Sequence, residues 1–237
     1  SPAISVQIRL HPPQPVTLEA LAERGALPAE AVTLLDAIAR SGHGLLIAGE
    51  PGAGKTTLAG AIAARLPLDA SAIAVERAAE LPLPDRFARE TASDERPSAD
   101  ALRAALDQRP AWLVVDEVRG DEVAALWNAL AGPSAPRLIC VWRGATDPDR
   151  LRSALNIAIR QEQPALPQAA IDTALAARFP FVAALKATAD GPRLALLAET
   201  RLDGEVLRIV PLIEARGGAW HTSGEQPTHA LDAAGEA

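Results

Sequence analysis

The segment Gly49–Thr56 constrains the fold of this chain more than any other part of the sequence. Its residues, Gly-Glu-Pro-Gly-Ala-Gly-Lys-Thr, match the pattern GxxxxGK[ST] at every fixed position. The apolar run Gly44–Ala48 before it is typical of a buried strand, and Thr57–Leu66 after it has the composition of a helix. A strand, a glycine-rich turn and a helix direct backbone N–H groups and a positive helix end toward phosphate. The sequence therefore predicts an α/β fold with a phosphate loop.

This loop predicts a site for ATP together with Mg²⁺. Lys55 is expected to contact the β- and γ-phosphates, and the Thr56 hydroxyl to bind Mg²⁺. The chain has 23 Lys and Arg residues, but its only lysines are Lys55 and Lys186, so a lysine stands where a compact ammonium on a flexible stem is needed. The candidate nucleotide-binding residues are Gly49, Glu50, Pro51, Gly52, Ala53, Gly54, Lys55, Thr56 and Thr57.

A second candidate element is an apolar strand that ends in two carboxylates, Val114-Val115-Asp116-Glu117. Asp116 is a candidate magnesium ligand, directly or through water. Glu117 is a candidate catalytic residue that polarises the attacking water. The carboxyl ends of parallel strands are where open α/β sheets bind ligands, so both groups are expected near Lys55. The alternative is a solvated acidic loop after a core strand.

Composition excludes several other classes of protein. The chain has 237 residues, which suits one large α/β domain, and its net charge of −7 argues against a general nucleic-acid binder. Its single cysteine, Cys140, excludes an intrachain disulfide framework and favours a cytoplasmic location. The four histidines are scattered without ligand spacing, so no metal site is expected from them.

The rest of the chain predicts a mostly parallel central sheet with a C-terminal antiparallel β extension. Residues 182–188, 194–202 and 206–213 are typical of β-strands, and the dipeptides Asp190-Gly191 and Asp203-Gly204 mark turns between them. Residues 86–96 are polar and are expected to form an exposed loop or hairpin. We predict three regions: a remnant strand (residues 4–10) and linker of an N-terminal domain in 1–16, an ATPase domain in 17–216, and a disordered tail in 217–237.

The order of the motifs resembles that of a known family. After the phosphate loop come Ala74-Val75-Glu76 with Glu80-Leu81, then Arg109-Pro110, the apolar strand, and Glu117-Val118-Arg119-Gly120. This order is similar to that of the type II/type IV secretion and pilus traffic ATPases, and most similar to the tight-adherence pilus and type IV secretion branch.

This resemblance implies a RecA-like domain in a homo-hexameric ring at the cytoplasmic face of the inner membrane. The ring would associate peripherally with the membrane platform of a secretion or pilus system, and ATP hydrolysis would drive it. The resemblance makes Glu117 the catalytic glutamate, places Glu76 near the attacking water or magnesium, and gives Arg119 an assisting role. Arg86 and Arg89 match a region whose arginines reach a neighbour's γ-phosphate, although a solvated hairpin is an equal alternative.

Two departures from the family pattern affect the expected chemistry. The family has glycine where this chain has Asp116, and it has a histidine box where residues 131–145 contain no histidine. Trp142 or Arg143 lies near the position of the second histidine. Arg143 could supply the missing charge, or it could be solvated while Trp142 belongs to the core.

Three functions follow from these observations. The first is an ATP-hydrolysing motor subunit of a secretion or pilus system. The second is a ring subunit that binds nucleotide but hydrolyses it weakly, which the missing histidines favour and the Asp116-Glu117 pair opposes. The third is a soluble AAA-type or nucleotide-kinase protein without a membrane machine.

Overall fold

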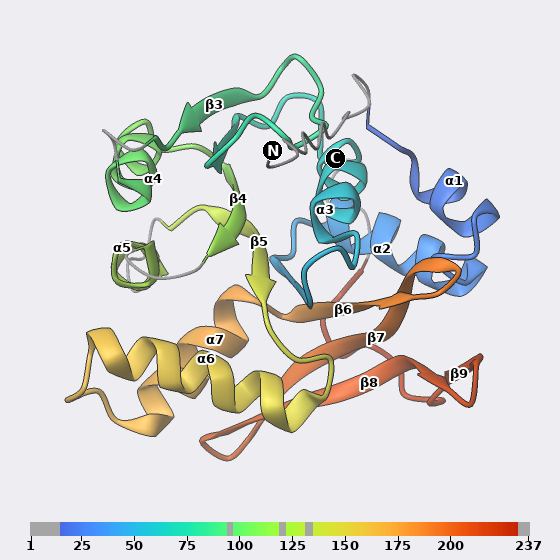
Figure 1. The fold of residues 1–237 in the computed structure, drawn as a ribbon. Helices are drawn as coiled ribbons and strands as arrows, with labels where there is room; N and C mark the ends of the chain where they lie inside the picture. The colour runs from blue at the N-terminus through green and yellow to red at the C-terminus, as the bar shows by residue number, and fades with distance from the viewer. Residues whose placement is uncertain (1–14, 94–96, 119–121, 131–134, 232–237) are drawn as a thin grey trace, which may run out of the picture.

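The computed structural model describes residues 15–93, 97–118, 122–130 and 135–231. Within them the chain forms a sheet in the strand order β3-β2-β4-β5-β1-β6-β7-β8-β9, with helices packed on both faces (Figure 1). The α/β fold and its mixed sheet are as the sequence predicts. The predicted strand at residues 4–10 lies outside the described residues.

The parallel part of the sheet contains the strands that carry the motifs. It consists of β1 (Leu45–Gly49), β2 (Ala72–Glu76), β3 (Ala88–Thr91), β4 (Trp112–Val118), β5 (Arg137–Arg143) and β6 (Phe181–Thr188). Strand β1 is buried along its whole length, as a parallel strand covered on both faces must be. The polar segment around β3 pairs in parallel with β2, so the loop or hairpin predicted for residues 86–96 is wrong at residues 88–91. These residues form a short edge strand, and because its side chains are mostly exposed, its sequence has the polar composition of a loop.

The antiparallel part extends the same sheet through β6, β7 (Gly191–Asp203), β8 (Val206–Arg216) and β9 (Ala219–Thr222). The turns fall at the two Asp-Gly signals, so the predicted β extension is confirmed. Strand β9, however, lies in the segment predicted to be a disordered tail.

The helices divide into two layers, and each layer buries one face of the sheet. Helices α1 (Leu18–Glu23), α2 (Ala29–Ser41) and α3 (Lys55–Ala63) contribute to one hydrophobic cluster, in which Leu35 and Ile62 meet Ile47, Val114 and Val141. Helices α4 (Ser98–Asp107), α5 (Glu122–Leu130), α6 (Pro148–Glu162) and α7 (Gln168–Arg178) contribute to the other, in which Leu102 and Leu155 meet Leu46 and Cys140. Successive side chains of β1, β4 and β5 therefore pack alternately against one helix layer and the other.

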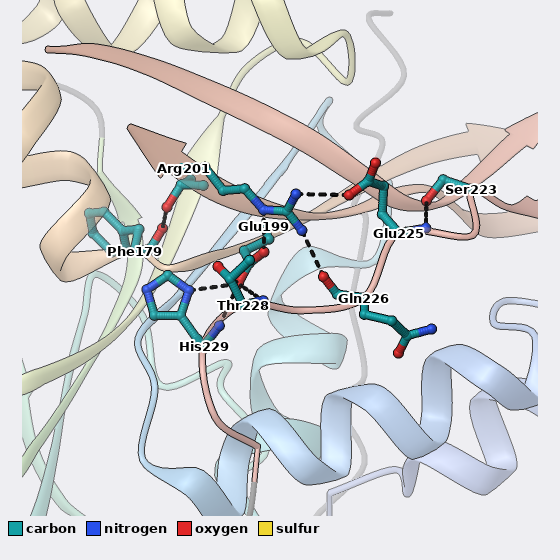
Figure 2. Close-up of polar contacts among 9 residues, drawn as sticks. Phe179, Glu199, Arg201, Ser223, Glu225, Gln226, Thr228 and His229 are labelled. Atoms are coloured by element: carbon teal, nitrogen blue, oxygen red, sulfur yellow. Dashed lines mark hydrogen bonds and ion pairs between the residues drawn. The ribbon is translucent and has the colours of Figure 1, made fainter. Parts of the chain in front are cut away.

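The segment after β9 is held by a buried carboxylate (Figure 2). Glu199 of β7 has no exposed surface, and its Oε1 accepts hydrogen bonds from the backbone N–H groups of Thr228 and His229, each at 2.8 Å. The Thr228 hydroxyl and the His229 ring also bond to this oxygen, and Arg201 bonds to Oε2. The prediction of disorder is therefore wrong for the described part of the tail. Its polar residues form hydrogen bonds with a buried carboxylate instead of with solvent.

Candidate nucleotide-binding site

The phosphate loop joins the end of β1 to the start of α3, as predicted. Gly54 lies in the left-handed region at φ 85° and is the residue before α3, a conformation that glycine adopts without steric cost. Gly49 allows a close approach, because a Cβ there would lie 2.3 Å from the Leu185 carbonyl oxygen. The exposed Glu50, Pro51 and Gly52 form the outer rim of the loop. The loop thus opens to solvent at the N-terminus of a helix, where anions bind.

Lys55 and Thr56 occupy the first turn of α3. Lys55 is 93% buried, and its Nζ donates a 2.8 Å hydrogen bond to the Glu50 carbonyl oxygen across the loop. The Thr56 hydroxyl donates to Asp116 Oδ1 at 3.0 Å, although the two residues are 60 positions apart. The structure therefore brings together the two motifs that the sequence places in one site.

Asp116 and Glu117 lie at the carboxyl end of β4, where the pairing with β5 shifts register between Val115 and Val118. Glu117 has φ 57°, a left-handed conformation that is uncommon for a residue other than glycine. Such backbone conformations cluster at functional sites. The shift in register interrupts the regular pairing of β4 at the carboxylate pair. The backbone of these two residues therefore departs from the regular strand geometry that precedes them.

Burial raises the pKa of the Asp116 carboxyl to about 6. The Thr56 hydroxyl opposes this effect by donating its hydrogen bond, whereas the negative charges of Glu117, Glu76 and Glu80 add to it. The charged form of Asp116 is therefore unfavourable in the protein alone. A cation at this carboxylate would relieve that cost.

The donors at this position fit Mg²⁺. The Thr56 hydroxyl and the Asp116 carboxylate are oxygen ligands of the kind that Mg²⁺ binds, usually together with phosphate oxygens and water. Among the described residues, no group of three His, Cys, Asp or Glu residues could hold a metal ion by itself. The protein thus offers a partial shell that a nucleotide would complete.

Glu76 lies at the end of β2, the strand beside β4. It is almost completely buried: Oε2 accepts a 3.0 Å hydrogen bond from the Leu81 backbone N–H, and Oε1 pairs with Arg89. Its negative charge adds a smaller contribution to the raised pKa of Asp116. Both of its oxygens have partners within the chain. Its role toward water or magnesium stays a prediction.

The candidate arginines have different surroundings. Arg86 donates to the carbonyl oxygens of Pro67 and Leu66 at 2.7 and 2.8 Å, and Arg89 binds Glu76 and the Leu81 carbonyl oxygen. Both arginines therefore hold their own chain together, which neither the arginine-finger nor the solvated-hairpin interpretation anticipates. Arg119 lies outside the described residues.

A pocket of about 280 Å³ adjoins the first turn of α3. Sequence motifs did not reveal it, because most of its lining lies outside the phosphate loop, on α1, the α1–α2 connection, β6 and the turn into β7. The Asp190-Gly191 turn signal was the only sequence hint of its far wall. Besides Gly54 and Thr57, the lining includes Leu21, Arg24, Leu27, Leu58, Asp190 and Pro192.

Comparison with known proteins agrees with this geometry. Residues 2–132 match the family model described as "Type II/IV secretion system protein". The chain belongs to the type II/IV secretion system ATPase family. Its matched region includes the phosphate loop and the Asp116-Glu117 pair.

Several relatives support this assignment. Over 133 residues the chain is 36% identical to a Mycobacterium tuberculosis protein with a provisional conjugal-transfer name, covering 53% of this chain and 38% of that one. It is 29% identical over 133 residues to the type IV secretion system protein VirB11 of Brucella suis, covering 52% and 37%. The matched segment thus spans less than two fifths of either relative's length.

Solved structures show the same fold. The VirB11 ATPase of Brucella suis, solved in complex with sulphate, superposes with a TM-score of 0.62 at 24% identity, covering 77% of this chain and 54% of that one. The pilus retraction motor PilT with bound ADP gives 0.56 at 21% identity, covering 83% and 57%. The predicted RecA-like ATPase fold is confirmed by these matches.

Proposed function

We propose that this chain binds ATP with Mg²⁺ and hydrolyses it as a motor subunit of a secretion or pilus system. The observation that carries the proposal is the contact between Thr56 and Asp116 beside the buried Lys55. This contact joins the phosphate loop to the carboxylate strand in the arrangement that phosphate-loop enzymes use.

Each part of the site has a place in this proposal. The backbone N–H groups of Gly52–Lys55 and the positive end of α3 hold the phosphates, and Lys55 exchanges its Glu50 contact for the β- and γ-phosphate oxygens. Thr56 and Asp116 hold Mg²⁺, which when bound neutralises charge on the phosphates. Glu117 accepts a hydrogen bond from the attacking water and polarises it. The pocket beside α3 receives the ribose and base, because it adjoins Gly54 and Thr57.

The proposal extends to the surroundings of the chain. We propose that residues 17–216 form the ATPase domain, whose sheet β9 extends beyond that bound. Family membership supports a homo-hexameric ring in the cytoplasm, attached peripherally to an inner-membrane platform, and the tight-adherence branch stays a prediction. Within the described residues, no helix is both long and hydrophobic enough to cross a membrane. The acidic chain is not expected to bind nucleic acid.

A second candidate function is a ring subunit that binds nucleotide but hydrolyses it weakly. Two observations favour it: residues 131–145 lack histidine, and Glu76 is tied to Arg89 and Leu81 within the chain. The two functions share the binding site and differ only in turnover.

The variant Lys55→Ala tests the shared part of the proposal. Removing the ammonium should weaken binding of a fluorescent ATP analogue in Mg²⁺ roughly 30-fold or more, which corresponds to about 2 kcal/mol. Lys186→Ala, which removes the only other lysine, is the matched control and should bind like the wild type. Equal affinity of the Lys55 variant and the wild type would refute the proposed site.

A further inference from the structure

Strand β5 ends between the two halves of the nucleotide site. It lies between β4, which ends in Asp116 and Glu117, and β1, which leads into the phosphate loop. Its last residue, Arg143, stands opposite Gly49 in the β1–β5 register, and the next backbone N–H, that of Gly144, donates to the Gly49 carbonyl oxygen at 3.3 Å. Since neighbouring strands are about 4.8 Å apart, the Arg143 backbone lies about one strand spacing from the start of the phosphate loop.

The side-chain alternation of β5 assigns Arg143 to a face of the sheet. Ile139 and Val141 belong to the cluster beneath α1, α2 and α3, whereas Leu138 and Cys140 belong to the opposite cluster. Trp142 packs on that opposite cluster, and this settles its alternative role in favour of the core. Because successive side chains point to opposite faces, Arg143 falls on the α3 face. Val114 and Asp116 on β4 share that face, and the Asp116 carboxylate meets Thr56 of α3 there.

The surroundings of Arg143 differ from those of Arg86 and Arg89. Arg143 is exposed. Within the described parts of the chain its guanidinium has no hydrogen-bond or ion-pair partner. Arginine binds phosphate oxygens through paired, charge-assisted hydrogen bonds. A guanidinium at the junction of the phosphate loop and the carboxylate strand would meet the part of the nucleotide that extends toward Glu117, which is the terminal phosphate.

We propose that Arg143 binds the γ-phosphate of a bound nucleoside triphosphate, so that the chain distinguishes the triphosphate from the diphosphate. This inference rests on the proposed function, since it needs nucleotide in the phosphate loop. In the proposed reaction the oxygen of the attacking water bonds to the γ-phosphorus while the bridging oxygen leaves with the β-phosphate. The guanidinium also stabilises the negative charge that is spread over the equatorial γ-phosphate oxygens in this transition state.

The test compares the affinities for a non-hydrolysable ATP analogue and for ADP, both with Mg²⁺, by isothermal titration calorimetry. Arg143→Ala should weaken binding of the triphosphate analogue about tenfold and change ADP affinity by less than about twofold. Arg143→Lys should restore part of the preference. Arg150→Ala, an exposed arginine on α6, is the matched control and should change neither affinity.

The outcomes separate this inference from the proposed function. If Lys55→Ala weakens nucleotide binding as expected while Arg143→Ala behaves like Arg150→Ala for both nucleotides, the role of Arg143 is refuted and the nucleotide site stands. If the wild type binds neither nucleotide, or Lys55→Ala binds both normally, the proposed function fails and this inference fails with it. An equal loss for ATP analogue and ADP would also overturn it, because that result indicates a structural role or general phosphate attraction.

Discussion

At the scale of single residues, the site carries a stability cost that can be measured. The unfolded chain ionises Asp116 at its ordinary pKa of 3.8, whereas burial raises the pKa to about 6 in the folded protein. Between these values the folded state binds more protons, so this group lowers stability as pH rises from about 4 to about 6, and the full cost persists above that range. The carboxylate is therefore unfavourable for the fold of the protein without metal.

We expect Asp116→Asn to stabilise the protein without nucleotide or Mg²⁺. The amide keeps an acceptor for the Thr56 hydroxyl but carries no charge, so the variant should gain roughly 1–2 kcal/mol at pH 7.5, after allowance for partial exposure. The gain should shrink as pH falls from 7 to 5, and thermal unfolding across that range measures it. The same variant should lose Mg²⁺-dependent ATP binding. A variant less stable than the wild type at pH 7.5 would contradict this account.

At the scale of elements, the segment after β9 is held mainly through one buried carboxylate. Burial raises the pKa of Glu199, but the hydrogen bonds from His229, Arg201 and Thr228 outweigh that effect and lower the pKa to about 2. Because the folded pKa lies below the ordinary value of 4.5, the charge stabilises the fold fully above about pH 4.5. That contribution is lost as pH falls toward 2.

We expect Glu199→Gln to cost about 2–3 kcal/mol at neutral pH, since the amide cannot accept from all the donors that face the carboxylate. Limited proteolysis should then cut residues 223–231 faster, and urea unfolding should show the lower stability. The exposed Glu205 on the β7–β8 turn supplies the control variant Glu205→Gln, which should change neither measurement. A loss no larger than that of the control would show that Glu199 does not hold the segment.

These elements also show what sequence patterns can and cannot predict. The strand β1 and the antiparallel strands were predictable, because continuous burial and Asp-Gly turns are local signals. Strand β3 was not, because an edge strand with exposed side chains looks like a polar loop. The ordered segment after β9 was not either, since its partners lie about 30 residues away on β7. Long-range satisfaction of a buried charge leaves no local pattern.

At the scale of the whole molecule, the sequence likewise predicts those parts of the site that have local motifs and misses those that depend on long-range packing. The phosphate loop and the carboxylate pair were predictable from their motifs, and the contact of Thr56 with Asp116 confirms that they meet. The pairing of Arg89 with Glu76 and the pocket beside α3 depend on how distant segments pack, so no sequence motif predicts them. The face of Arg143 became clear only when the strand order placed β5 between β4 and β1.

The placement of the arginines bears on the proposed ring. Arg86 and Arg89 are bonded within their own chain, so supplying a neighbour's site would require them to break several hydrogen bonds. The phosphate loop, in contrast, has an exposed rim that a neighbouring subunit could cover. If subunits complete each other's sites in a ring, hydrolysis per chain should depend on the concentration of the chain.

We therefore expect steady-state ATP hydrolysis per chain to rise steeply with protein concentration and then to level off. Sedimentation velocity with Mg²⁺ and a non-hydrolysable ATP analogue should show assembly over the same concentration range. Glu117→Gln should assemble and bind nucleotide but lose turnover, by about 100-fold or more, because water is no longer polarised. Turnover per chain that is constant across concentrations would contradict shared sites. Assembly without turnover in the wild type would favour the binding subunit over the motor, since the two functions differ only in that step.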